Sequence, residues 1–487
     1  MAAVPGLFER GTRRAARGLV PGLLLTSPRN RTIAALAGLS LYVAIYSFVW
    51  PSAPLLSARD SQEYIDYAAR LLHGSFSEPH YRLPGYPLLL ALLGGSDVIA
   101  SRSLFFFQLI THVVGIGLLA SVLKRLGVRR PLRALFAGLM LLPPFVDSAA
   151  FILTESFTGF LLAGFFYCLV RWLLDRAPKD AWIAGCFAAA VFLVRPVYLL
   201  LAAFLVGILY LTRGRRPSLH AAIGLATPSI LACAVIIGIN YAAFGYGGLT
   251  PKTGFMLFTR TLTFLERIPD SEADVREVLI RSRDRSLTVR GSSHTGTQFL
   301  WEGGMAELVA TTGKSRTALS RDMLRLNVKL IAGEPLQYAA VVARSVSDLW
   351  FPSATRLSFF GNPYLQLGWA ILHLILVALY FFALAGAAAR MFVLTARGTE
   401  VLPVPSPSLH LSSGAVEALL HATIWYTCLV SAAVEVGEPR YMRPVLPLAA
   451  ATVALFLVRW QDLRQRRRFQ VSESGEQHTP LLERSTA

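Results

Sequence analysis

Long runs of apolar residues without a charged side chain constrain this chain most strongly. Three of them are Thr32–Trp50, Leu104–Leu123 and Leu367–Ala389. Each is about as long as a helix that crosses a hydrocarbon core, which needs ~20 residues. The chain as a whole is 54% hydrophobic and 16% charged, whereas soluble domains carry about 25% charged residues. We therefore predict an all-α polytopic membrane protein.

The apolar stretches predict about ten transmembrane helices. We place them at residues 32–50, 104–123, 133–147, 151–172, 181–194, 196–212, 219–243, 366–389, 412–434 and 443–459. We divide residues 181–212 into two spans at Arg195-Pro196 because proline disfavours a helical conformation at the residue before it.

The distribution of lysine and arginine sets the expected orientation. The segments predicted to be cytoplasmic hold 25 of these residues, and the short outer turns hold only Arg195, Arg440 and Arg443. This asymmetry follows the positive-inside rule. It also explains the net charge of +18 without a basic nucleic-acid-binding face, so we expect membrane lipids and no nucleic acid as partners.

The orientation divides the chain into five parts. They are a cytoplasmic basic tail (1–31), an N-terminal transmembrane module (32–243) with a first outer loop (51–103), an outer domain (244–365), C-terminal transmembrane helices (366–460) and a cytoplasmic tail (461–487). Within the outer domain, the apolar spacing of Arg321–Trp350 is typical of a helix. We expect this domain to be mainly helical.

The first outer loop contains the most informative residues. Asp60 opens an amphipathic run with Tyr64 on its apolar side, which predicts a helix along the interface whose dipole stabilises the carboxylate. The alternative for Asp60 is a plain N-cap. Glu63 and Asp66 are expected to be solvated.

The same loop continues as HYRLPGYPLLLA from His80 to Ala91. Two prolines and a glycine fix a bent backbone, and Arg82 lies beside the aromatic rings of Tyr81 and Tyr86. A guanidinium in this setting can bind a phosphate through two hydrogen bonds. The alternative is an arginine that reaches the lipid headgroups.

Other charged residues of the apolar segments collect at the same predicted face. Glu155 begins an apolar helix, and a carboxylate at membrane depth usually faces a polar cavity or a partner. The alternative is a buried ion pair with Arg195 or another outer arginine. Glu438-Pro439-Arg440-Tyr441 completes the group. A reaction centre at the outer interface needs charges gathered in this way, whereas an ion relay needs them along its path.

With these residues, the chain resembles the membrane glycosyltransferases of the C-type fold. The likeness is to the group that includes protein O-mannosyltransferases and the transferase that adds aminoarabinose to lipid A. It covers most of residues 32–460. The elements that carry it are Asp60 with Tyr64, Arg82–Ala91, Thr154-Glu155, Arg195-Pro196 and Arg440–Pro447.

The resemblance implies an inverting transfer of a monosaccharide from a polyprenyl-phosphate donor. Asp60 would be the general base, and Glu155 a second acidic group near the acceptor or a metal. The residues expected to bind the donor phosphate are Arg82, Arg440 and Arg195, in that order of preference. The residues expected to contact substrate are Tyr64, Tyr81, Tyr86 and Tyr441. No motif requires a cofactor, and a divalent metal stays open.

One departure from the family pattern bears on the acceptor. Protein O-mannosyltransferases have adjacent acidic residues in the first loop, whereas Ser61 follows Asp60 here. A glycan or lipid acceptor is therefore favoured over a protein. The resemblance also implies a bacterial cytoplasmic membrane with the active site on the outer face. The alternative function, a secondary transporter or lipid flippase, predicts internal symmetry and charges at mid-membrane.

Overall fold

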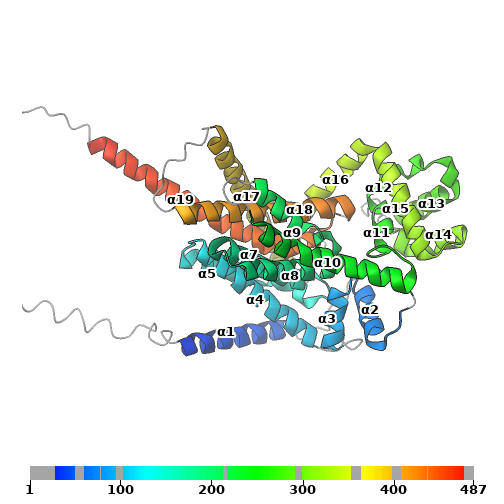
Figure 1. The fold of residues 1–487 in the computed structure, drawn as a ribbon, viewed down its shortest axis with the longest axis horizontal. Helices are drawn as coiled ribbons and strands as arrows, with labels where there is room; N and C mark the ends of the chain where they lie inside the picture. Colours follow the sequence, from blue (N-terminus) through cyan, green and yellow to red (C-terminus); the bar gives the residue numbers. More distant parts are fainter. Residues whose placement is uncertain are drawn as a thin grey trace, which may run out of the picture. The chain divides into compact units, whose positions relative to one another are not determined.

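The computed structural model describes residues 28–49, 60–76, 78–94, 102–211, 217–290, 299–351, 363–396, 407–435 and 437–476. Throughout this part of the chain the regular elements are helices, which confirms the all-α prediction (Figure 1). Residues 1–27, most of the predicted N-terminal tail, and residues 477–487, the end of the predicted C-terminal tail, lie outside the described residues.

The helices follow the apolar stretches of the sequence. The first ten are α1 (Pro28–Val49), α2 (Ser61–His73), α3 (Gly85–Leu93), α4 (Ser103–Arg125), α5 (Arg130–Met140), α6 (Pro143–Val146), α7 (Glu155–Asp175), α8 (Pro178–Val194), α9 (Leu201–Leu211) and α10 (Leu219–Phe244). The later ones are α11 (Lys252–Met256), α12 (Phe258–Thr261), α13 (Ala273–Arg290), α14 (Met305–Thr312), α15 (Arg316–Gly333), α16 (Pro335–Trp350), α17 (Pro363–Ala396), α18 (Pro407–Val434) and α19 (Leu446–Glu476). Shorter turns are η4 (Asp147–Ala150), η5 (Pro196–Tyr198), η6 (Leu262–Arg267), η7 (Asp270–Glu272), η8 (Leu300–Gly304) and η11 (Pro439–Val445).

Each predicted span contains helix, and the structure refines how many helices can cross a membrane by themselves. Within the described ranges six are long and apolar enough: α4, α7, α10, and the stretches 366–390, 414–434 and 439–462. The bent pair of α5 with α6–η4 makes a seventh if it is one span. The chain is therefore a multi-pass membrane protein. The segments α8 and η5–α9 are short because Arg195-Pro196 ends one helix and begins the next.

Two compact units make up the chain, Met1–Ala53 with α1 and Pro54–Ala487 with the other helices. Within the second unit, α7 packs against α4 and α8, and α8 packs against α10 (Figure 1). The closest approach is at Gly185 of α8, which faces the backbone carbonyls of Gly224 and Leu225 in α10. Small residues permit such contacts between membrane helices.

Three places where these helices begin, end or turn lie close together, and each of them carries a charged residue. α7 begins at Glu155, and α8, joined to it by a short connection, ends just before Arg195. The start of α7 therefore lies near the end of α8. The turn η11, which carries Arg440, packs against both α7 and α18. The fold thus brings three sequence-distant charged residues to one end of the bundle.

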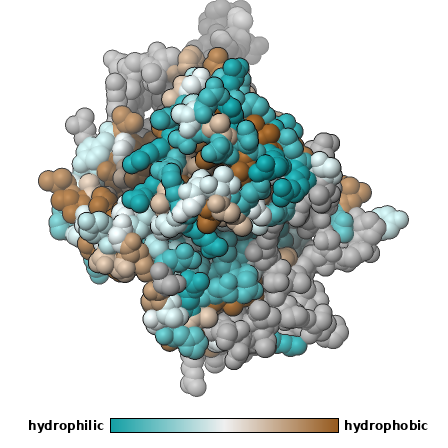
Figure 2. Space-filling model, turned by 90° about the vertical axis from the view of Figure 1, so that its right-hand side faces the viewer, coloured by the Kyte–Doolittle hydropathy of each residue, from teal (hydrophilic) through white to brown (hydrophobic). Residues whose placement is uncertain are grey.

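Helices α11–α16 form a cluster with a hydrophobic core of its own. Its most deeply buried side chains include Phe255, Phe258, Leu265, Leu279 and Leu319. The described parts of the segment 244–365, which are 244–290, 299–351 and 363–365, are therefore mainly helical, as predicted. Figure 2 looks from the side on which α13 and α14 lie in Figure 1, and hydrophilic side chains dominate the described surface there. Such a surface suits contact with water.

Because α8 and α10 approach closely, adding a single methyl group at Gly185 should lower the stability of the protein. A Cβ on Gly185 would meet the Leu225 carbonyl oxygen at 3.0 Å and the Gly224 carbonyl oxygen more closely still. Gly185→Ala should therefore lower stability by ~1–3 kcal/mol, as overpacking does. Thermal unfolding in detergent measures this. The matched control is Gly207→Ala in α9, where nothing lies within 4 Å, and equal effects of both changes would contradict the prediction.

Candidate active site

A cavity of about 640 Å³ lies where the helix ends of the bundle meet the α11–α16 cluster. Segments from the whole length of the second unit line it, from the start of α2 to η11. Its charged lining residues are Asp60, Glu63, Arg82, Glu155, Arg195, Lys252, Glu435, Glu438 and Arg440. One compartment therefore collects the acids and arginines that the sequence singled out.

Asp60 lies between two arginines. Its Oδ1 is 2.8 Å from Arg82 Nη2, and its Oδ2 accepts a hydrogen bond of 2.5 Å from Arg440 Nη2. The carboxylate makes no capping bond to the start of α2, so Asp60 is not a plain N-cap. The next residue fixes the helix instead, because Ser61 Oγ donates to the Ile152 carbonyl. Asp60 is thus anchored to the entry of α7 and turned toward the arginines.

Glu63 was predicted to be solvated, but in the structure it lines the cavity and is paired with basic side chains. Its Oε2 accepts hydrogen bonds from Arg82 Nε at 2.5 Å and from Lys252 Nζ at 3.0 Å. It occupies the helical turn after Asp60, so both acids face the cavity. Sequence reasoning also missed Lys252, which lies in α11 and has no local pattern around it. Asp66, by contrast, is exposed and pairs with Gln62 as a surface residue does.

The charges of this group determine its protonation. Burial opposes ionisation of Asp60, but Arg82, Arg440 and Lys252 outweigh it and hold the pKa of the carboxyl well below its ordinary value. Burial likewise opposes the charge on Glu63, whose pKa is nevertheless lowered by Arg82 and Lys252. Burial and the neighbouring Arg82 lower the pKa of the Lys252 ammonium. Asp60 is therefore ionised at neutral pH and able to accept a proton.

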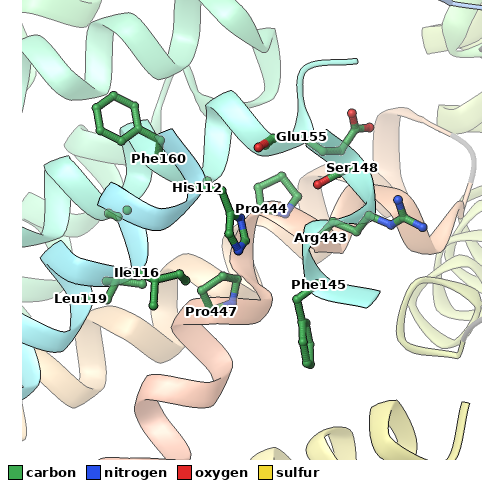
Figure 3. A pocket seen from close by; sticks show the side chains of 14 residues that line it. His112, Ile116, Leu119, Phe145, Ser148, Glu155, Phe160, Arg443, Pro444 and Pro447 are labelled. Atoms are coloured by element: carbon green, nitrogen blue, oxygen red, sulfur yellow. The ribbon is translucent and has the colours of Figure 1, made fainter. Parts of the chain in front are cut away.

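Glu155 is buried at the start of α7 and borders two spaces. It lines the large cavity and also a small pocket of about 20 Å³, enough for about one water molecule. In Figure 3, Glu155, Ser148 and Arg443 gather at one end of this pocket and Ile116, Leu119 and Pro447 at the other.

The ion pair with Arg195, the alternative considered for Glu155, is not formed among the described residues. Glu155 Oε2 is buried there without a hydrogen-bond partner. Arg443, the other nearby arginine, pairs with Asp147 at 2.8 Å. Glu155 therefore keeps an acceptor oxygen for a ligand.

Three of the four predicted tyrosines line the cavity. Arg82 Nη1 donates to the Tyr64 hydroxyl at 3.1 Å, and the guanidinium carbons of Arg195 and Arg440 each lie 5.1 Å from the Tyr441 ring centroid. Tyr81 lines the wall near α11. Tyr86 departs from its predicted substrate contact. It is fully buried and packs edge-to-face behind Tyr64 at 5.2 Å, so it supports the wall without forming it.

One side of the cavity is apolar. Its wall there comes from the start of α9 and the end of α18, and its lining residues include Leu199, Leu200, Tyr426, Val430 and Val434. Leu200 and the nearby Phe204 are also exposed at the surface of the bundle, 61% and 40% respectively. The site thus joins a charged compartment to an apolar wall that continues to an apolar helix, α9, exposed at the surface of the bundle.

The acidic residues do not form a metal site as they stand. Within the described ranges, no three His, Cys, Asp or Glu side chains lie close enough together to hold a metal ion. Both oxygens of Asp60 are already engaged by arginines. We therefore derive no chemical step through a metal.

Comparison with known proteins gives similarity in structure alone. No family model and no curated protein sequence matches the chain. One similar solved structure is the archaeal oligosaccharyltransferase AglB from Archaeoglobus fulgidus, in complex with an inhibitory peptide and a dolichol-phosphate. It has 14% sequence identity and a TM-score of 0.43, and the match covers 94% of this chain and 53% of that one.

A second similar structure is ArnT from Cupriavidus metallidurans bound to undecaprenyl phosphate. The identity is 13% and the TM-score 0.33, and the match covers 86% of this chain and 78% of that chain. The present chain spans about half the length of the first protein. At these identities and TM-scores neither structure lends a residue role to this chain, and the function proposed below rests on its own residues.

The ion pairs of Asp60 predict how stability depends on pH. Since the folded pKa lies below the ordinary 3.8, the stabilisation is fully present above about pH 4 and is lost as the pH falls further. Asp60→Asn should therefore lower the melting temperature by a constant amount between pH 8 and about 5, and the difference should narrow below about 4.

Thermal unfolding across this pH range tests the prediction. Asp66→Asn is the matched control on the same helix, and as a surface change it should alter stability by no more than ~0.5 kcal/mol. A difference between wild type and Asp60→Asn that already closes near neutral pH would show that the Asp60 carboxylate is not held ionised.

Proposed function

We propose that the protein is an inverting glycosyltransferase. It moves a monosaccharide from a polyprenyl-phosphate donor to a glycan or lipid acceptor on the outer face of the membrane. The observation that carries this proposal is the composition of one cavity. It combines an ionised carboxylate, three arginines and an apolar wall that reaches an apolar helix at the surface of the bundle.

The donor consists of an apolar chain, a phosphate and a sugar, in that order. The cavity offers an apolar wall, arginines and carboxylates to match these three parts. The polyprenyl chain lies along the apolar wall of α9 and α18. The phosphate meets Arg82 and Arg440, with Arg195 behind Tyr441. Guanidinium groups suit this contact because two parallel N–H donors match two phosphate oxygens. The donor sugar then lies toward Asp60 and Glu155.

Asp60 is the general base of the proposed reaction. The acceptor hydroxyl oxygen attacks the anomeric carbon as Asp60 takes the hydroxyl proton. The bond from the anomeric carbon to the phosphate oxygen breaks on the opposite side, which inverts the configuration. Polyprenyl phosphate leaves with the electron pair, and the arginines stabilise its added charge. Glu155, with its unpartnered oxygen, accepts a hydrogen bond from a sugar hydroxyl.

The ion pairs of Asp60 fit this sequence of events. Without donor, Arg82 and Arg440 both contact Asp60, and a carboxylate held in this way is a weak base. A phosphate competes for the same guanidinium groups. As they turn toward it, Asp60 loses part of its stabilisation and becomes more basic when the sugar is in place.

The charges inside the bundle favour an enzyme over a transporter or flippase. Glu417 of α18 is the acidic residue nearest mid-membrane in the predicted topology. It pairs with Arg390 and Arg459, which the positive-inside rule assigns to cytoplasmic helix ends. Within the described ranges, the remaining acids of the bundle gather at the cavity, at Asp147 beside it, or toward the opposite end, where Asp175, Asp180 and the last acids of α19 (Asp462, Glu473 and Glu476) lie. The spaced charges of an ion path are not seen there.

Substitution of Asp60 tests the assigned base. In liposomes with radiolabelled polyprenyl-phosphate sugars, Asp60→Asn should keep donor binding and lower turnover by about 10²- to 10⁴-fold, the usual contribution of a general base. Asp66→Asn, on the exposed side of the same helix, is the matched control. If Asp60→Asn turns over normally, the base is a different carboxylate, with Glu155 the next to examine.

Substitution of Arg82 tests the phosphate contact separately. Arg82→Gln should weaken donor binding by roughly tenfold or more, because a hydrogen bond to a charged group contributes ~1.5–3 kcal/mol. Arg70→Gln on α2 is the control, since Arg70 does not line the cavity. If wild type binds no polyprenyl-phosphate sugar, the proposed function is wrong and transport becomes the leading alternative.

A further inference from the structure

A second part of the cavity, which we call the aromatic end, is lined by aromatic side chains from other elements than α9 and α18. The ring of Trp301 lies edge-to-face with Tyr81 at 5.9 Å between centroids. Lys252 Nζ lies 5.2 Å from the centroid of the same indole. All three side chains line the cavity. None of them has a part in the proton transfer or the phosphate contact proposed above.

Trp301 is presented by an unusual turn. It belongs to η8, a turn whose backbone leaves helical φ and ψ at Glu302 and Gly303. Gly303 has φ +115° there, a conformation that side chains disfavour. Ser286 Oγ donates to Glu302 Oε2 at 3.0 Å and fastens the turn to α13.

The residues before Trp301 hold the turn from the other side. Phe299 and Leu300 are each 1% exposed in the core of the α11–α16 cluster. Trp301 follows them immediately and borders the cavity. The fold therefore holds one large aromatic ring in a fixed position at the cavity wall, attached to a packed core.

A series of side-chain contacts connects this aromatic end to Asp60, the proposed base. Lys252 touches Trp301 on one side and Glu63 on the other. Glu63 contacts Arg82, and Arg82 contacts Asp60. From Asp60 the series continues through Arg440 and Tyr441 to Arg195. Asp60 thus stands between two groups: the aromatic end, which reaches it through Glu63 and Arg82, and the pair Arg440 and Arg195. An acceptor hydroxyl must meet the anomeric carbon at this position.

We propose that Trp301, with Tyr81 and Lys252, forms the acceptor subsite and that the acceptor group bound there is a sugar ring. This rests on the proposed function and narrows its choice between a glycan and a lipid. A pyranose has a face of C–H groups and a rim of hydroxyls. The indole plane packs against the face, while Glu63 and Lys252 hydrogen-bond to the rim. Apolar contact with a few placed polar groups is how small-molecule sites fix orientation.

A lipid chain fits this end less well. The polyprenyl chain of the donor already uses the apolar wall of α9 and α18. At the aromatic end the lining includes Glu63, Lys252 and two threonines, Thr250 and Thr253. An alkyl chain placed there would bury charged and hydroxyl groups without partners, which costs free energy.

A panel of methyl glycosides of mannose, glucose and galactose tests the subsite. Saturation-transfer NMR would measure their binding to the full-length protein in nanodiscs that contain undecaprenyl phosphate. At least one glycoside should bind wild type. Trp301→Leu, which keeps apolar bulk without an aromatic plane, should weaken that binding roughly tenfold. Trp301→Phe should stay much closer to wild type.

The controls test the acceptor subsite separately from the proposed polyprenyl-phosphate donor. Trp460→Phe, far from the cavity in α19, should bind as wild type does. Undecaprenyl phosphate binding is measured on the same samples and checks that each variant is folded. Absence of glycoside binding, or equal binding by Trp301→Leu and Trp301→Phe, would overturn the sugar subsite. Failure of wild type to bind undecaprenyl phosphate, with Trp301-dependent glycoside binding intact, would instead overturn the proposed donor.

Discussion

The placement of Asp60 between Arg82 and Arg440 is the interaction on which the site depends. A buried carboxylate is costly without partners, and so is a buried guanidinium. Their pairing ties the entry of α2, the segment before α3 and the turn before α19 around one cavity. The two partners of Asp60 come from opposite ends of the second unit. The last membrane segment is therefore as necessary to the site as the first loop.

The same constraint explains why the bundle is interrupted where it is. Regular helices satisfy their backbone groups internally, so they can cross lipid but present few polar side chains at their ends. The breaks at Arg195-Pro196, before Glu155 and at η11 expose backbone and charge at one end of the bundle. The α11–α16 cluster closes this end with its own core and contributes Lys252 and Trp301. An amphiphilic compartment is the result.

Much of this arrangement could be predicted from the sequence because it depends on local properties. Hydropathy located the helices, and the prolines located their breaks. Asp60, Arg82, Glu155, Arg195 and Arg440 were each recognised next to a helix end or proline, and all of them line the cavity. Glu63 was misjudged because a helix-surface acid looks the same whether it faces water or a lysine from another segment. Tyr86 was misjudged because its neighbours in sequence do not show which face of α3 is covered.

The sequence by itself determined that this chain enters a membrane, where its helices break and which of its ends carry charge. These follow from hydrophobicity, proline geometry and the distribution of arginine, all of which act over a few residues. Only the tertiary structure decided which charges meet. The contacts of Asp60 with Arg440, of Glu63 with Lys252 and of Tyr81 with Trp301 join residues about 190 to 380 positions apart. Such contacts depend on how the helices pack, and no periodicity or motif along the chain specifies that packing.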